Sequence, residues 1–345
     1  MPNNLFKKGL LLGIIVLFIG VGIIPSSGVQ IEKNITIPIN RGDTLYVGGS
    51  GPNNYTKIQD AADDASNGDT VFVFDDNAPY FEQIFVNNSI NLIGENKYTT
   101  VLNSISNEDI LEIQSDNVII TGFTIQNSIN RGIRVVRFHN ITIYENIFIN
   151  NRVDIGLLDS CYNFIHDNCF FTNSAYSSID FDDSSNNIIL RNVIQNSGKI
   201  GFGMYISGDN NEIKYNIFKN NYVGISLHDE SNIISYNCFD SNRKCAIYMT
   251  FWNSENSKIT CNNFINNGLI VFQLGINFQY MLSTIESEQV DANYWDTWTG
   301  SGPNRVRCSV RIDFFERDPF WYFSISIPWL SFDWNPVSEP YDIGM

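Results

Sequence analysis

A short run of the sequence contains three aspartates that could bind a metal ion or act as catalytic acids: Asp180, Asp182 and Asp183. Ile179 and Phe181 alternate with them, and this period of two puts Asp180 and Asp182 on the solvent face of a strand. Clustered carboxylates suit calcium, a hard ion that prefers oxygen ligands. Two carboxyl groups about 5–9.5 Å apart would also allow general acid–base cleavage of a glycosidic bond. The run therefore contains candidate catalytic or Ca²⁺-binding residues, and a solvated acidic strip is the alternative interpretation.

The elements that must position these residues are repeated along the chain. A motif Ile-x-x-Asn-x-Phe, or a close variant, occurs six times at intervals of 21 to 25 residues. Ile120-x-x-Phe123-x-Ile125 is an earlier, diverged copy. Between the copies lies a second motif with aliphatic residues two apart, as in Gly132-Ile133-Arg134-Val135. Both motifs have strand periodicity and are separated by Asn, Asp, Ser and Gly, which favour turns.

A strand repeat with a period near 23 residues predicts a single-stranded parallel β-helix whose coils stack about 4.8 Å apart. Equivalent residues then form columns along the axis. An inward amide at a turn can donate to one neighbouring coil and accept from the other, so we expect the repeated asparagines to form a buried ladder. Ordinary surface turns are the alternative. The six expected ladder residues are Asn146, Asn168, Asn192, Asn216, Asn237 and Asn262.

The column that contains Asp180 carries a second group of candidates. It is expected to read Arg134, Gly156, Asp180, Tyr205, Ser226 and Tyr248, beside a column of Leu158, Asp182, Ser207, His228 and Thr250. Carboxylates beside exposed tyrosines suit a sugar, since its apolar faces stack on rings while its hydroxyls meet acids. Tyr205, His228 and Tyr248 are therefore candidate ligand-binding residues.

The histidines and cysteines give no confident metal site. His139, His166 and His228 are expected in different columns, whereas soft metals require clustered ligands. The cysteines lack Cys-x-x-Cys spacing, which argues against zinc. Disulfides of an exported protein, such as Cys238 with Cys261, and small buried thiols both stay open.

The N-terminal residues outside the repeat have two expected parts. Residues 1–28 look like a signal peptide or a membrane anchor, because Lys7 and Lys8 precede an apolar stretch at residues 9–24 that is a possible tether. Residues 29–70 are expected to contain a short helix that caps the first coil. Thr56-Lys57-Ile58-Gln59 has the pattern of a capping box at its start.

Residues 71–276 are expected to form the β-helix and residues 277–345 a C-terminal cap. Five of the six tryptophans lie in this cap, and its prolines, among them Pro319 and Pro328, favour an irregular structure. A binding surface built from these tryptophans is the second interpretation.

Several segments resemble known β-helix proteins. Tyr55–Ala62, Gly68-Asp69-Thr70-Val71 and Leu92-Ile93-Gly94 resemble the opening of right-handed parallel β-helix proteins of the pectin-lyase-like class. The Asn-x-Ile-x-x-Asn-x-Phe copies resemble the NosD-like and carbohydrate-binding/sugar-hydrolase (CASH) branch. Asn293-Tyr294-Trp295-Asp296 resembles the tails of archaeal exported members. The resemblance implies an all-β, right-handed parallel solenoid and leaves the activity open, because this fold hosts lyases, hydrolases and adhesins.

We therefore expect an exported or cell-surface β-helix that binds a polysaccharide or another surface partner without catalysis. A polysaccharide lyase or glycoside hydrolase acting through Asp180–Asp183 is the alternative, and the resemblance adds an accessory role in copper-enzyme maturation. A formal net charge of −16 argues against nucleic acid as a partner, because phosphate neutralisation needs a basic face.

Overall fold

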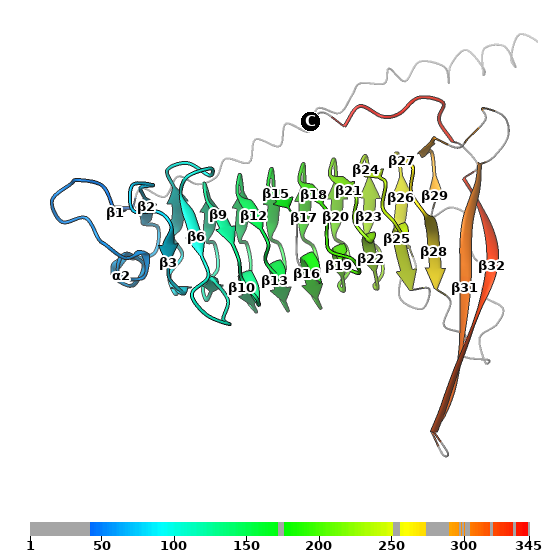
Figure 1. Ribbon diagram of the computed structural model, residues 1–345, viewed down its shortest axis with the longest axis horizontal. Coiled ribbons are helices and arrows are strands. Elements are labelled where there is room, and N and C mark those ends of the chain that lie inside the picture. The colour runs from blue at the N-terminus through cyan, green and yellow to red at the C-terminus, as the bar shows by residue number, and fades with distance from the viewer. Residues whose placement is uncertain are drawn as a thin grey trace, which may run out of the picture. The chain divides into compact units, whose positions relative to one another are not determined.

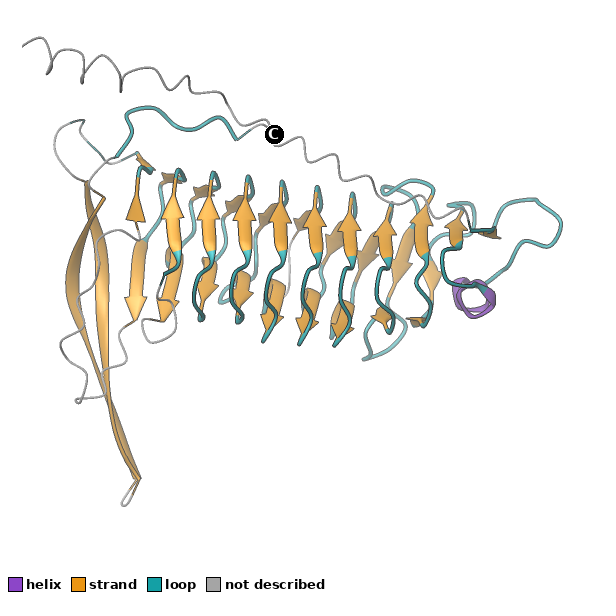
Figure 2. Ribbon diagram, turned by 180° about the vertical axis from the view of Figure 1, so that it is seen from behind, coloured by secondary structure: helices purple, strands orange, loops and turns teal. Residues whose placement is uncertain are grey.

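The computed structural model describes residues 42–171, 176–250, 256–273, 290–296, 298, 300, 304–317, 320–333 and 336–343. All of them belong to one compact unit, Arg41–Met345. Within it the chain winds as a parallel β-helix, so the all-β solenoid predicted from the repeat is confirmed (Figures 1 and 2). The expected signal or anchor at residues 1–28 lies outside the described residues. Among the described helices none is both long and apolar enough to cross a bilayer.

Each coil contributes one strand to each of three parallel sheets, which we call sheets A, B and C in the order that the chain visits them. Sheet A contains β1 (Thr44–Val47), β2 (Thr70–Val73), β5 (Asn91–Gly94), β8 (Ile119–Thr121), β11 (Thr142–Tyr144), β14 (Phe164–His166), β17 (Ile188–Leu190), β20 (Glu212–Lys214), β23 (Ile233–Ser235), β26 (Lys258–Thr260) and β29 (Val290–Asp291). Sheet B contains β3 (Tyr80–Phe81), β6 (Val101–Asn103), β9 (Thr124–Gln126), β12 (Ile147–Ile149), β15 (Cys169–Phe171), β18 (Val193–Gln195), β21 (Ile217–Lys219), β24 (Cys238–Asp240), β27 (Asn263–Ile265) and β30 (Tyr294–Trp295). Sheet C contains β4 (Ile84–Val86), β7 (Leu111–Ile113), β10 (Arg131–Val136), β13 (Val153–Leu158), β16 (Ser177–Asp182), β19 (Phe202–Ile206), β22 (Val223–Leu227), β25 (Cys245–Thr250) and β28 (Leu269–Gln273).

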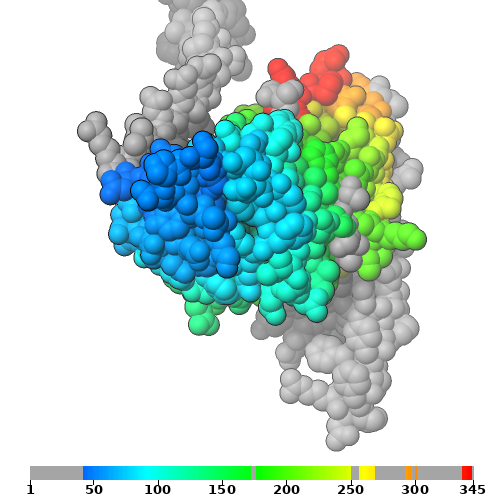
Figure 3. All heavy atoms as spheres, turned by 60° about the vertical axis from the view of Figure 1, so that its left-hand side comes forward, coloured from blue at the N-terminus to red at the C-terminus, as the bar shows by residue number. Residues whose placement is uncertain are grey.

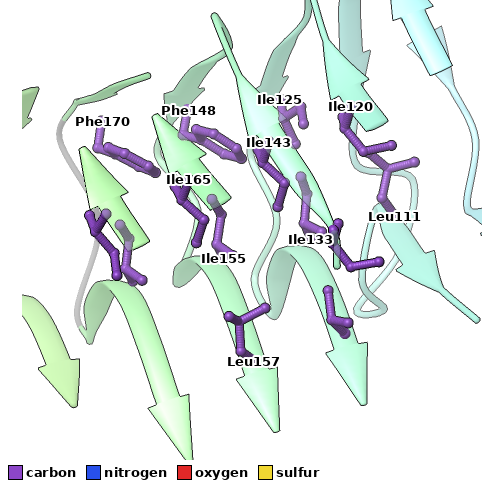
Figure 4. Close-up of a cluster of buried hydrophobic side chains, with 14 of the residues drawn as sticks. Leu111, Ile120, Ile125, Ile133, Ile143, Phe148, Ile155, Leu157, Ile165 and Phe170 are labelled. Atoms are coloured by element: carbon purple, nitrogen blue, oxygen red, sulfur yellow. The ribbon is translucent and has the colours of Figure 1, made fainter. Parts of the chain in front are cut away.

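The core is built from the inward residues of the three sheets (Figure 4). Aliphatic side chains fill most of the interior, and the inward column of sheet B is aromatic except at Leu102, Ile125 and Ile194. Phe218, Phe239, Phe264 and Trp295 stack in succession, with ring centroids 5.0, 5.1 and 4.4 Å apart. Trp295 therefore continues the core column and is not part of an exposed tryptophan surface. Strands β29 and β30 extend sheets A and B past residue 276, where the repeat was expected to end.

Buried asparagines hold the corner between sheets A and B. The backbone N–H groups of Asn146, Asn168, Asn192, Asn216, Asn237 and Asn262 each donate to the side-chain oxygen of the equivalent asparagine on the following coil, at 2.8–3.0 Å. The last of these acceptors is Asn293, a seventh member. The side-chain nitrogens donate back to carbonyls of the preceding coil, as from Asn216 to Ile189 at 2.9 Å. Every inward amide is thus satisfied inside the core.

The other two corners have ladders of their own. At the corner between sheets C and A, the N–H groups of Asn163, Asn187 and Asn211 donate to the next asparagine at 2.8–2.9 Å. At the corner between sheets B and C, Asn221 and Asn242 donate in the same way to Asn242 and Asn267. The Asn-Asn doublets and the asparagine that opens each repeat carried this signal in the sequence.

A short helix, α2 (Ile58–Asp64), packs against β1, β2 and β4 at the N-terminal end of the stack (Figure 1). The first described residues, in blue, cover this end of the molecule (Figure 3). The predicted helix is therefore confirmed, but the predicted capping box is wrong, because no side chain of its own first turn caps it. Instead, the Glu82 carboxylate accepts from the N–H groups of Ile58 and Gln59, both at 3.0 Å. The helix lies beside the first strand of sheet C, so a residue of that coil reaches its N-terminus.

Strands β31 (Asn304–Arg317) and β32 (Phe320–Asp333) pair regularly as the two arms of an antiparallel hairpin. The irregular structure expected here is corrected by this hairpin, in which Pro328 lies within β32 opposite Ser309. Both strands of a two-stranded sheet are edge strands, and edge strands tolerate proline. Farther along, the backbone of Tyr341 exchanges two hydrogen bonds of 2.8 Å with the Asn263 side chain, so this segment is fastened to the last coils.

Candidate functional site

The solvent face of sheet C carries the column expected from the sequence. The register pairs Arg134 with Gly156, Gly156 with Asp180, Asp180 with Tyr205, Tyr205 with Ser226, and Ser226 with Tyr248. Glu112 precedes Arg134 in the same column. We call these seven residues the sheet C column. Because the strands are parallel and in register, the column places one residue of this face on each successive coil, and only Gly156 lacks a side chain.

Asp180 is the half-buried acid of this column. The preceding rung is Gly156, and a Cβ atom there would lie 2.7 Å from Cδ and Nε of Arg131. The absence of a side chain at Gly156 therefore makes room for Arg131 beside Asp180. Burial raises the pKa of the Asp180 carboxyl, the Arg131 charge opposes this rise, and the Asp182 charge adds to it. Asp182 is exposed on the same strand.

Aromatic rings follow Asp180 along the face. The rings of Tyr205 and His228 lie 4.5 Å apart, and those of His228 and Tyr248 lie 6.3 Å apart. The Ser226 hydroxyl is 2.8 Å from Nε2 of His228. Burial lowers the pKa of His228 and outweighs the opposing effect of Asp229, so the imidazole is neutral near pH 7. The three candidate ligand-binding residues are thus brought together.

The three candidate aspartates are placed unequally. Asp180 and Asp182 share the outward face of β16, whereas Asp183 has left the strand and adopts a left-handed turn conformation with φ +49°. Within the described ranges, no three or more His, Cys, Asp and Glu side chains gather closely enough to hold a metal ion. The structure therefore joins two of the three acids and supplies no three-carboxylate group for calcium.

The described histidines lie in three separate places. Nδ1 of His139 accepts from the Cys161 backbone at 3.0 Å. His166 is on sheet A, where its Nδ1 is 2.6 Å from the Asp167 carboxylate and its ring stacks on Tyr144. His228 faces outward beyond sheet C.

The five described cysteines are free thiols, namely Cys161, Cys169, Cys238, Cys245 and Cys261. The disulfide considered between Cys238 and Cys261 is therefore not formed, and the buried-thiol interpretation holds for Cys245, whose pKa burial raises to about 12. The side chain of Cys308 lies outside the described residues.

Three cations lie next to the site, and two of them, Arg131 and Lys244, were not singled out from the sequence. Arg131 lies over Gly156, as described above. Nη1 of Arg134 is 2.8 Å from the Glu112 carboxylate, and its Nε is 3.7 Å from Asp109. Nζ of Lys244 lies 5.1 Å from the ring centre of Tyr248. The alternation of strand residues placed Arg134 in the column from the sequence, but the paths of Arg131 and Lys244 depend on neighbouring coils.

The stacked parallel coils, with acids and aromatic rings on one outer sheet face, define the chain as a parallel β-helical solenoid. The chain belongs to the family described as periplasmic copper-binding protein (NosD), whose model matches residues 62–256 and 158–300.

Two similar proteins illustrate the relationships. A cell surface glycoprotein of Methanothermus fervidus is 30% identical over 165 residues, which are 45% of this chain and 27% of that protein. The chain thus spans about a quarter of the length of this curated relative. The crystal structure of alginate lyase from Paenibacillus sp. str. FPU-7 superposes with a TM-score of 0.52 at 14% identity, covering 68% of this chain and 94% of that one. At this identity the likeness shows the fold alone.

The family description names copper, so the described side chains are compared with the ligands that copper sites use. Copper sites use clustered imidazole, thiolate or thioether ligands. The described histidines are separated, and the described methionines, Met204 and Met249, are buried in the core. The described residues therefore do not fit a copper centre.

Proposed function

We propose that this NosD-family β-helix is an exported surface protein that binds a carbohydrate polymer along the outer face of sheet C, without turnover. The observation that carries the proposal is the sheet C column, which sets Asp180, Tyr205, Ser226 and Tyr248 on consecutive coils. Export is supported by the charged and apolar residues 1–28 and by the name of the Methanothermus fervidus relative.

The chemistry of the column suits sugar rings. Tyrosine presents a flat apolar face with a polar tip, which matches a pyranose with its apolar face and rim of hydroxyls. The carboxylates accept hydrogen bonds from such hydroxyls, while the buried Ser226 hydroxyl contacts the His228 ring between the two tyrosines. Coils about 4.8 Å apart repeat at close to the length of one sugar residue in an extended polymer, so successive rungs can meet successive sugars.

A hydrolase is the second candidate, and one observation favours it. Asp180 and Asp182 are two residues apart on one strand face, which separates their Cα atoms by roughly 6.6 Å. The pKa of Asp180 is raised, as a general acid requires, while Asp182 is exposed. A lyase is less well supported, because the Arg134 guanidinium is already held by Glu112 and Asp109.

Binding assays on the whole protein test the proposal. Soluble neutral, basic and acidic glycans are titrated against the parent and the variants Tyr205→Ala and Tyr248→Ala, and we expect affinity to fall about tenfold or more in each variant. Tyr215→Ala is the matched control, because Tyr215 stacks on Tyr236 at a left-handed turn between sheets A and B. Unchanged affinity in both site variants would refute the proposal.

Turnover and copper are measured on the same samples. Cleavage of a bound glycan that Asp182→Ala abolishes would establish the hydrolase, whereas binding without new chain ends supports the module. A role in copper-enzyme maturation, implied by the family resemblance, requires a tight copper site in a titration of the full chain.

A further inference from the structure

We propose that the sheet C column selects glycans that present hydroxyl or amino hydrogen-bond donors and discriminates against polyuronates. This inference rests on the proposed carbohydrate-binding function and specifies its ligand class. It differs from what the fold neighbour's name suggests, since alginate is a polyuronate.

Carboxylates surround the middle of the column. Asp180 is adjacent to Tyr205 in register, and Asp182 lies on the same face of the same strand. Burial raises the pKa of the Tyr205 hydroxyl, and the negative charges of Asp180, Asp182 and Asp229 raise it further, as expected for carboxylates near this ring. Asp229 is fixed there by hydrogen bonds from the Ser207 hydroxyl, at 2.8 Å, and from Gly208.

The neighbouring cations lie against other groups of this face. Arg134 is paired with Glu112 and Asp109, at the first rungs of the column. Arg131 lies against Gly156 and acts on Asp180, which it partly neutralises. Lys244 lies over the rings of Tyr222 and Tyr248, at 5.7 and 5.1 Å, several coils from Asp180. A ligand carboxylate at Tyr205 would therefore meet acceptors where it needs donors.

A polyuronate cannot avoid this contact. It carries one carboxylate on every sugar, and the column repeats about once per sugar, so some carboxylate falls beside Asp180 or Asp182 whatever the register of binding. Repulsion between a ligand carboxylate and a neighbouring aspartate lowers affinity on the order of tenfold. Hydroxyl and ammonium groups at the same place instead donate to these acids.

The test compares three hexasaccharides by calorimetric titration of the whole protein: a neutral β-linked glucan, a glucosamine oligomer and a galacturonate oligomer. We expect the neutral or amino oligomer to bind at least about tenfold more tightly than the galacturonate at low salt. The double variant Asp180→Asn/Asp182→Asn preserves side-chain shape and removes both charges. It should bind galacturonate about tenfold more tightly than the parent and the glucosamine oligomer more weakly. The control Glu145→Gln/Glu212→Gln removes two charges from outside this face and should change neither affinity.

The outcomes separate the two proposals. Galacturonate binding that is the tightest of the three and does not rise in the double variant would overturn the ligand class, while carbohydrate binding at this face would stand. Failure of all three oligomers to bind would overturn the proposed function, and the ligand class with it. Equal gains in the double variant and the control would show a general charge effect and overturn the role of Asp180 and Asp182.

Discussion

Replacement of Asn216 by leucine tests the physical basis of the corner ladders. The Asn216 side-chain oxygen accepts from the Asn192 backbone at 2.8 Å, and its nitrogen donates to the Ile189 carbonyl at 2.9 Å and to Asn237 at 3.0 Å. Leucine has a similar volume, so the substitution removes these bonds without opening a large cavity.

The expected cost follows from the groups left behind. The buried N–H of Asn192 loses its acceptor, which costs about 1–3 kcal/mol, and the lost side-chain bonds add about 1 kcal/mol. We therefore expect the free energy of unfolding to fall by about 2–4 kcal/mol. Asn107→Leu is the control, because Asn107 is exposed and such surface changes stay within about 0.5 kcal/mol.

Two measurements check this expectation. Urea unfolding followed by circular dichroism gives the shift in midpoint, and native-state hydrogen exchange reports single amides even if coils open separately. The Asn192 amide should exchange much faster in the variant, whereas the Asn237 amide, which donates to Asn262 at 2.9 Å, should change less. A midpoint equal to that of the control, with Asn192 still protected, would refute the reasoning.

Four further predictions follow from other contacts. Phe218→Ala should cost about 3–5 kcal/mol in urea unfolding, because its ring is buried and stacks on Phe239, and a loss below about 1 kcal/mol would contradict the packing. Glu82→Ala should cost about 1 kcal/mol and speed amide exchange at the start of α2, while unchanged exchange there would exclude the cap. Burial favours the neutral form of Asp167, but hydrogen bonds from His166 and Arg191 lower the pKa of its carboxyl to about 2. The contribution of this carboxylate to folding stability is therefore present above pH 4 and lost as pH falls toward 2. Asp167→Asn should weaken the acid dependence of stability, measured as the melting temperature over an acid titration. Burial raises the pKa of Asp180, so the contribution of this carboxyl to folding stability is present at low pH and lost as pH rises. Asp180→Asn should therefore raise the melting temperature above that of the parent at pH 7, and the difference should shrink below pH 4. A variant that melts below the parent at pH 7 would contradict the direction of the pKa shift.

The sequence predicted those parts of the molecule that depend on period. Apolar residues two apart and a recurring asparagine define the coil, and once the coil is known the neighbours of Asp180 in register follow. Contacts that depend on side-chain paths could not be predicted in this way. Glu82 reaches α2 from a coil about 24 residues away, and Arg131 crosses Gly156.

The C-terminal hairpin shows the limit of local rules. Proline is disfavoured in a central strand, but Pro328 lies in a two-stranded ribbon, where both strands are edge strands and tolerate it. The sequence has no periodicity here that distinguishes an edge strand from an irregular segment. A ligand for the outer face of sheet C could likewise not be predicted from residue types alone, because acids and tyrosines are common on protein surfaces.

The Asn262–Asn293 rung has a consequence for how such chains diversify. These two residues are 31 positions apart, against 21–25 for the other rungs from Asn146 onward, yet the hydrogen bond between them is 2.8 Å long. The geometry of the corner hydrogen bond thus does not depend on the number of residues that lie between successive corners. A gene can gain whole coils, or graft new loops onto an existing coil, without disturbing the scaffold, so molecules of very different length and specificity can share one framework.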